Sequence, residues 1–176
     1  FDVMPHFPAR IIKDKATLTN WVAAYKEVGV QQGLLLAGGV STPVGDYATS
    51  MQLLESGAFD GFKRLHVAGH PEGNKDIDPD GSDRMVMEAA RWKSAFMDRT
   101  DAQMAMATQF CFEAQPVIDW VNRLTAEGLE DVHGLLGEGR PATAVGRRKR
   151  AERTAVAGER NERGGAHIPK LHDRLA

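Results

Sequence analysis

The segment from Arg64 to Asn74, RLHVAGHPEGN, holds the side chains of the chain best suited to chemistry. A short β-branched run ends there in a Pro-Glu-Gly loop. Strand alternation places His66, Ala68 and His70 on one face, with His70 at the end of the strand. In parallel α/β proteins, ligands bind at the carboxyl ends of strands. The segment therefore predicts a strand that ends at a binding site.

Metal ligation is one alternative for these residues. The two histidines are spaced as metal ligands can be, but a zinc site needs further ligands, and a structural histidine beside one at a loop mouth is the simpler interpretation. The loop 75–84 begins like a calcium loop, yet Met87 stands where a bidentate glutamate belongs, and Pro79 interrupts the loop. We expect no metal, and an acidic turn in which Ser82 caps the next helix.

Two further segments, 32–43 and 104–113, also pass from an apolar run into a loop. Gly38 and Gly39 follow the first run and would let a flat or phosphorylated ligand approach the backbone, although a simple turn is the favoured interpretation of this segment by itself. Gln109 follows the second run, where its carboxamide could pair with a heterocycle or remain solvated. Cys111 has no neighbour that would activate its thiol, so we expect a small buried apolar residue.

The elements that must position these residues alternate between strands and helices at a spacing of roughly 30 to 40 residues. This alternation predicts right-handed βαβ units and a parallel sheet, with Thr17 capping the first helix and the second strand buried on both faces. Both an open doubly wound sheet and a partial barrel fit four or five such units. We expect strands at 3–11, 32–37, 64–70 and 103–110, with 131–136 as the candidate for a fifth, and helices at 17–28, 47–56, 82–95 and 115–127.

Composition divides the chain near residue 133. Residues 1–133 form an acidic, patterned domain, whereas 134–176 are basic, rich in Gly, Ala and Arg, and contain no aromatic residue. We expect the second part to be largely disordered, or partly helical near 146–160, because it has little apolar surface to bury. The RRKR cluster at 147–150 is interpreted as a solvated tail in preference to a nucleic-acid site.

Cysteine content and hydropathy bear on the location of the protein. The chain has one cysteine, no long apolar run and no secretion signal, so we expect a cytoplasmic protein without a membrane segment. Assembly into a homo-oligomer is left open.

Five short motifs in collinear order resemble the methylenetetrahydrofolate reductase family: PHF at 5–7, LLLAGG at 34–39, Tyr47-Ala48, HVAGHPEG at 66–73 and ATQF at 107–110. The resemblance covers about residues 3–128. It implies an α/β fold of the (β/α)8 TIM-barrel type, incomplete here because such a barrel needs about 250 residues. It also implies FAD as cofactor, NAD(P)H as hydride donor and 5,10-methylenetetrahydrofolate as the folate substrate, which becomes 5-methyltetrahydrofolate.

The resemblance also assigns binding residues. Lys93 matches a basic residue that faces the FAD phosphates, Gln109 matches the glutamine that contacts the pterin, and Asn74 stands where many members have a histidine. The full set of expected cofactor contacts is His6, Gly38, Gly39, Tyr47, Ala48, Ala68, His70, Asn74 and Lys93.

Two departures from the family pattern limit the expected activity. Ala37-Gly38-Gly39 replaces an Arg-Gly-Asp, and the family's general-acid glutamate lies on a strand that would precede Phe1. No catalytic residue is therefore assigned, and we expect the chain alone to be inactive and to bind flavin poorly. The competing hypotheses are a non-catalytic flavin- or pterin-binding module and a nucleic-acid-associated protein that uses the basic tail.

The resemblance ends near Glu130, inside the expected barrel, where the composition changes. This break motivates the hypothesis of a truncated or frame-shifted reading, which sequencing of the parent gene tests.

Overall fold

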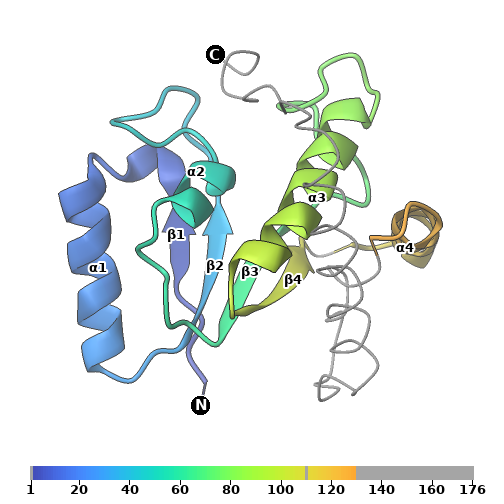
Figure 1. Ribbon diagram of the computed structural model, residues 1–176. Coiled ribbons are helices and arrows are strands. Elements are labelled where there is room, and N and C mark those ends of the chain that lie inside the picture. The colour runs from blue at the N-terminus through green and yellow to red at the C-terminus, as the bar shows by residue number, and fades with distance from the viewer. Residues whose placement is uncertain (1, 110, 130–176) are drawn as a thin grey trace, which may run out of the picture. The chain divides into compact units, whose positions relative to one another are not determined.

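The computed structural model describes residues 2–109 and 111–129. Four strand–helix units follow one another, as the alternation predicted (Figure 1). The predicted fifth strand, the boundary at 133, the tail and the RRKR cluster lie outside the described residues. The elements are β1 (His6–Pro8), α1 (Lys15–Glu27), β2 (Gln32–Leu36), α2 (Ser50–Glu55), β3 (Arg64–Gly69), α3 (Arg84–Phe96), β4 (Gln103–Thr108) and α4 (Ala114–Ala126), with 3-10 turns at Ala9–Ile11 and Met97–Arg99.

The four strands form one parallel sheet in the order β1-β2-β3-β4. Each strand is therefore the neighbour of the strand before it in the chain. A doubly wound sheet needs a reversal of this order, and none occurs among the described strands. The sheet is compatible with an incomplete α/β fold. Within the described residues, no helix has the length and apolarity to cross a membrane.

The hydrophobic core lies on one face of this sheet. Phe7, Leu35, Val67 and Met106 occupy one register row and are all buried. Side chains from all four α-helices join the same cluster. Right-handed crossovers that always step to the next strand place every helix on the same side, which explains the one-sided core.

The opposite face of the sheet shows that one sequence prediction was wrong. We expected β2 to be buried on both faces, but only Gly33 and Leu35 are buried, whereas Gln32, Leu34 and Leu36 remain partly exposed. These residues remain partly exposed because the described helices pack against the other face of the sheet only.

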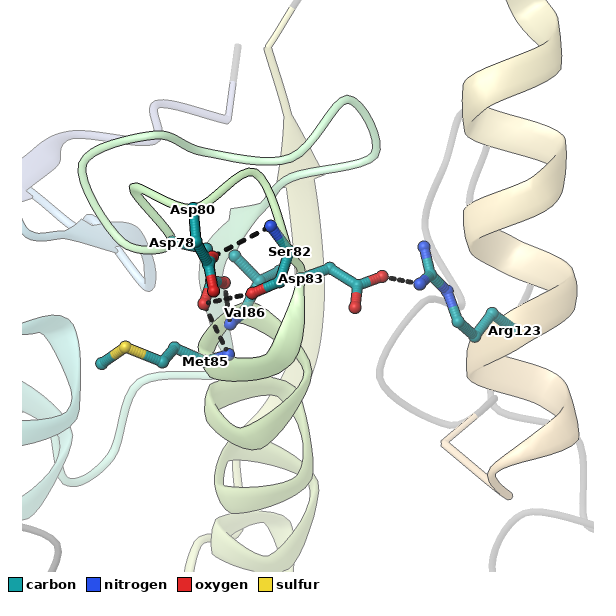
Figure 2. A network of polar contacts seen from close by, with 7 residues as sticks. All are labelled: Asp78, Asp80, Ser82, Asp83, Met85, Val86 and Arg123. Atoms are coloured by element: carbon teal, nitrogen blue, oxygen red, sulfur yellow. Dashed lines mark hydrogen bonds and ion pairs between the residues drawn. The ribbon is translucent and has the colours of Figure 1, made fainter.

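The starts of two helices also differ from the prediction. Helix α1 begins after Asp14, whose carboxylate accepts a hydrogen bond from the Thr17 amide at 2.8 Å, so Thr17 is not the cap. Helix α3 begins after Asp83, and Ser82 does not cap it. Instead, the buried Asp78 carboxylate accepts hydrogen bonds from the amides of the first turn of α3 (Figure 2). In both cases a carboxylate earlier in the chain replaces the predicted hydroxyl.

Gly69 marks the place where α4 crosses the end of β3. A Cβ atom at this position would lie 2.6 Å from Cη2 of Trp120 and 3.3 Å from Cβ of Met106. We expect Gly69→Ala to lower the free energy of unfolding by about 2 kcal/mol, because an added methyl group overpacks a closed core. Urea denaturation measures the change. Gly39→Ala, where no atom lies within 4 Å, is the matched control, and equal stability of the two variants would contradict the packing.

Candidate functional site

The candidate site lies at the carboxyl edge of the sheet, where the loops after β2, β3 and β4 begin. Gly69 pairs in register with Thr108, so His70 and Gln109 each lie one residue beyond neighbouring strands. The structure thus brings these two residues to a common edge. His6 is placed differently: it pairs with Leu34, which pairs with His66. His6 therefore lies four residues, or about 13 Å, before that edge.

Lys93 reaches this edge from the last turn of α3. Its side chain is buried, with 6% of the residue exposed, and its Nζ donates a hydrogen bond to the Ala68 carbonyl at 3.2 Å. Burial lowers the pKa of Lys93 to about 8. Among the ion pairs of residues 2–109 and 111–129, none joins a carboxylate to this ammonium group. A buried cation that is held by a carbonyl oxygen is costly, so the site favours an added anion.

His70 lies close enough to Lys93 to feel its charge, and Asn74 contacts His70. Nδ2 of Asn74 lies 3.4 Å from Nδ1 of His70. Burial lowers the pKa of His70, and the charge of Lys93 lowers it further, so the imidazole is neutral at pH 7. In the tautomer in which Nδ1 accepts from the Asn74 amide, the neutral ring carries its proton on Nε2, which can then donate to a ligand. Ala68, His70, Asn74 and Lys93 thus form one cluster, which we call the β3-edge cluster.

A second group of predicted residues lies in the loop between β2 and α2. Gly38 has a φ of 95°, and a Cβ atom there would lie 3.0 Å from Cβ of Pro8, so the backbone conformation requires glycine. Gly39 faces open space. Tyr47 belongs to the hydrophobic core, which leaves little of its ring for a ligand.

Ala48, in the same loop, has both polar main-chain groups bonded within the protein. Its amide donates to Oε1 of Gln52 at 2.6 Å, and its carbonyl accepts from Nε of Arg10 at 3.2 Å. Arg10 also donates from Nη1 to the Val40 carbonyl at 3.0 Å. Sequence reasoning missed Arg10, because its partners lie 30 and 38 residues away and no spacing marks them.

His66 and Cys111 take no part in the β3-edge cluster. Burial and the neighbouring Arg64 lower the pKa of His66, and its buried Nε2 has no hydrogen-bond partner among the described residues. Cys111 is partly exposed, and its Sγ donates to the Gln109 carbonyl at 3.3 Å, so the expectation of a buried thiol was wrong. It follows the end of β4, beyond the strand residues that pack in the core. Residues 2–109 and 111–129 contain no group of three or more His, Cys, Asp or Glu side chains placed to hold a metal ion.

Comparison of the chain with protein-family models finds no match. The resemblance to methylenetetrahydrofolate reductases stays an expectation drawn from the collinear motifs.

Proposed function

We propose that this chain is the flavin-binding part of a methylenetetrahydrofolate reductase-like protein and that it holds FAD at the carboxyl edge of its sheet. The observation that carries the proposal is Lys93, a buried ammonium group with a carbonyl partner and no carboxylate among the described ion pairs. A diphosphate supplies the missing negative charge, and lysine is a common phosphate ligand.

The other residues at this edge would contact distinct parts of FAD and of the folate. His70 offers Nε2 as a donor, and Asn74 orients its ring. The open space at Gly39 admits a flat group, and Gln109, beyond β4, would pair with the pterin of the folate. Bound FAD would supply hydride transfer from NAD(P)H to 5,10-methylenetetrahydrofolate.

The sheet topology supports the barrel part of the proposal. Four parallel strands in chain order, with the helices on one face, are compatible with an incomplete (β/α)8 barrel. We infer this barrel type from the order and the one-sided core together.

We propose flavin binding, without reduction of the folate, for the chain itself, because none of its residues is assigned to the family's general-acid role. The second candidate, a non-catalytic flavin- or pterin-binding module, shares the same β3-edge cluster. Flavin binding without NADH:menadione turnover would favour the module, and measurable turnover would favour the reductase.

The pH dependence of FAD binding tests the proposal. We expect weak but saturable binding at pH 7 that declines as the pH rises above about 8, because Lys93 must carry its proton to attract the phosphates. Bound phosphate raises the pKa of Lys93 and shifts this decline upward. Fluorescence titration of FAD at pH 7, 8 and 9.5 measures the effect. Absence of saturable binding, or an affinity that is constant over this range, would contradict it.

A further inference from the structure

The loop between β2 and α2, residues 37–49, is held against the segment that follows β1. The Arg10 amide donates to the Ala37 carbonyl at 2.9 Å, and the Val44 amide donates back to the Arg10 carbonyl at 2.8 Å. A third bond, from the Asp46 amide to the Lys13 carbonyl, measures 3.1 Å. The approach is so close that a Cβ atom at Gly45 would overlap the Lys13 carbonyl. The loop therefore packs backbone against backbone.

The side chain of Arg10 adds two bonds to this contact. Its Nε donates to the Ala48 carbonyl at 3.2 Å, and its Nη1 donates to the Val40 carbonyl at 3.0 Å. These carbonyls lie on the two arms of the loop. Because the guanidinium group is a planar fork with donors in fixed directions, it sets the separation of the two arms.

The far arm of the loop is also tied to α2. The Ala48 amide and the Thr49 amide both donate to Oε1 of Gln52, and Thr49 closes the capping box of the helix. Arg10 therefore links the end of β1, the glycine turn after β2 and the start of α2. Gly38, with its positive φ, lies within the part of the loop that these bonds enclose.

We propose that Arg10 is a positioning residue that clamps the 37–49 loop so that the Gly38-Gly39 backbone stays at the flavin site. This inference rests on the proposed function, and it assigns Arg10 no contact with the ligand. The clamp acts through the shape of the loop. Its loss should therefore both loosen the loop and weaken FAD binding.

Hydrogen exchange and FAD titration of Arg10→Met test the clamp. We expect faster amide exchange in peptides that cover residues 38–48, unchanged exchange in β3 and β4, and roughly tenfold weaker FAD binding, because two charge-assisted hydrogen bonds are lost. Lys13→Met is the matched control: it removes the same charge nearby but keeps the Lys13 carbonyl that holds Asp46. We expect it to match the wild-type protein in both measurements.

Two more variants keep the test decisive. Arg10→Lys retains the charge, but one ammonium group does not reproduce the fork, so we expect it to resemble Arg10→Met. Gly45→Ala pushes the loop away while Arg10 is intact, and should speed the same exchange even if Arg10→Met does not fold.

Unchanged loop exchange in the variants would overturn the clamp, as would full rescue by Arg10→Lys. Failure of the wild-type protein to bind FAD would instead contradict the proposed function and, with it, the positioning role of Arg10. The exchange data would still show whether Arg10 holds the loop.

Discussion

Lys93→Met should raise the free energy of unfolding at pH 7 by about 2 kcal/mol. Burial lowers the pKa of Lys93 from 10.5 to about 8, and a shift of this size corresponds to a penalty of about 3 kcal/mol for the charged form. The lost hydrogen bond to the Ala68 carbonyl offsets about 1 kcal/mol of the gain. Methionine fills a similar volume and favours helices, so the backbone of α3 is preserved.

The stability gain of Lys93→Met should depend on pH in a defined direction. Below pH 8 both the folded and unfolded states of the wild-type protein hold the proton, and the full penalty applies. Between pH 8 and 10.5 the unfolded state binds more protons, so wild-type stability rises with pH and the advantage of the variant shrinks. Urea denaturation of both proteins at pH 7, 9 and 10.5 measures the difference, in which other titrating groups cancel.

Lys63→Met, at an exposed position, is the matched control and should change stability little. A Lys93→Met protein that is less stable than the wild type at pH 7 would show that the buried ammonium group stabilises the fold. That result would contradict the interpretation that Lys93 is retained to bind an anionic ligand.

Lys93→Met should also weaken FAD binding by at least about tenfold, since a buried charge-assisted bond to phosphate is lost. A substitution that stabilises the protein and impairs binding is typical of a residue kept for function. A purely structural lysine would show losses in both properties. The opposite signs of the two effects therefore distinguish the two roles.

Asp78→Ala should lower the free energy of unfolding by about 3 kcal/mol, the largest loss that we expect from a single substitution. The residue is 3% exposed. Its carboxylate accepts hydrogen bonds from the amides of Met85 and Val86, each at 3.0 Å, and from the Ser82 hydroxyl at 3.3 Å (Figure 2). Alanine would leave these first-turn amides of α3 without an acceptor and would remove a negative charge from the positive end of the helix.

Asp80→Ala is the matched control for this prediction, because Asp80 is exposed and its carboxylate accepts a hydrogen bond from the Ser82 amide at 3.0 Å without contacting the first turn of α3 in the described bonds. We expect it to cost less than about 1 kcal/mol by urea denaturation. Asp78→Asn keeps one acceptor oxygen and should fall between the two. Equal stability of Asp78→Ala and Asp80→Ala would refute the role of the buried carboxylate.

Asp78 matters for the site because α3 carries Lys93. The loop between His70 and Asp83 leaves the carboxyl edge and returns as the start of this helix, and Asp78 fixes that return. Asp83 forms an ion pair with Arg123, which joins the start of α3 to α4 (Figure 2). The lysine is thus positioned by contacts at the opposite end of its own helix.

Local pattern was sufficient to predict the strand–helix order, because apolar periodicity reflects which side of each element is buried. It was insufficient for the order of the strands in the sheet. All helices lie on one face only when each new strand pairs with the strand that precedes it in the chain. The predictions of the helix caps were wrong for a related reason. Asp78 precedes α3 by several residues and reaches its first turn only once the loop has folded.

The site was predictable in part. The strand-end positions of His70 and Gln109 followed from alternation and from parallel strands, and the register confirms both. The burial of Lys93 and its bond to the Ala68 carbonyl depend on how α3 packs, which no local pattern reveals. The role of Arg10 could not be predicted, because its partners are main-chain carbonyls, which every residue possesses.

The most direct test of the proposed site is a fluorescence titration of the wild-type protein and Lys93→Met with FAD and with riboflavin at pH 7. Riboflavin has the ring system of FAD but lacks its diphosphate. We predict that the wild-type protein binds FAD more tightly than riboflavin and that Lys93→Met loses this preference. Equal affinity of the wild-type protein for the two flavins, or a preference that survives the substitution, would contradict the placement of the FAD phosphates at Lys93.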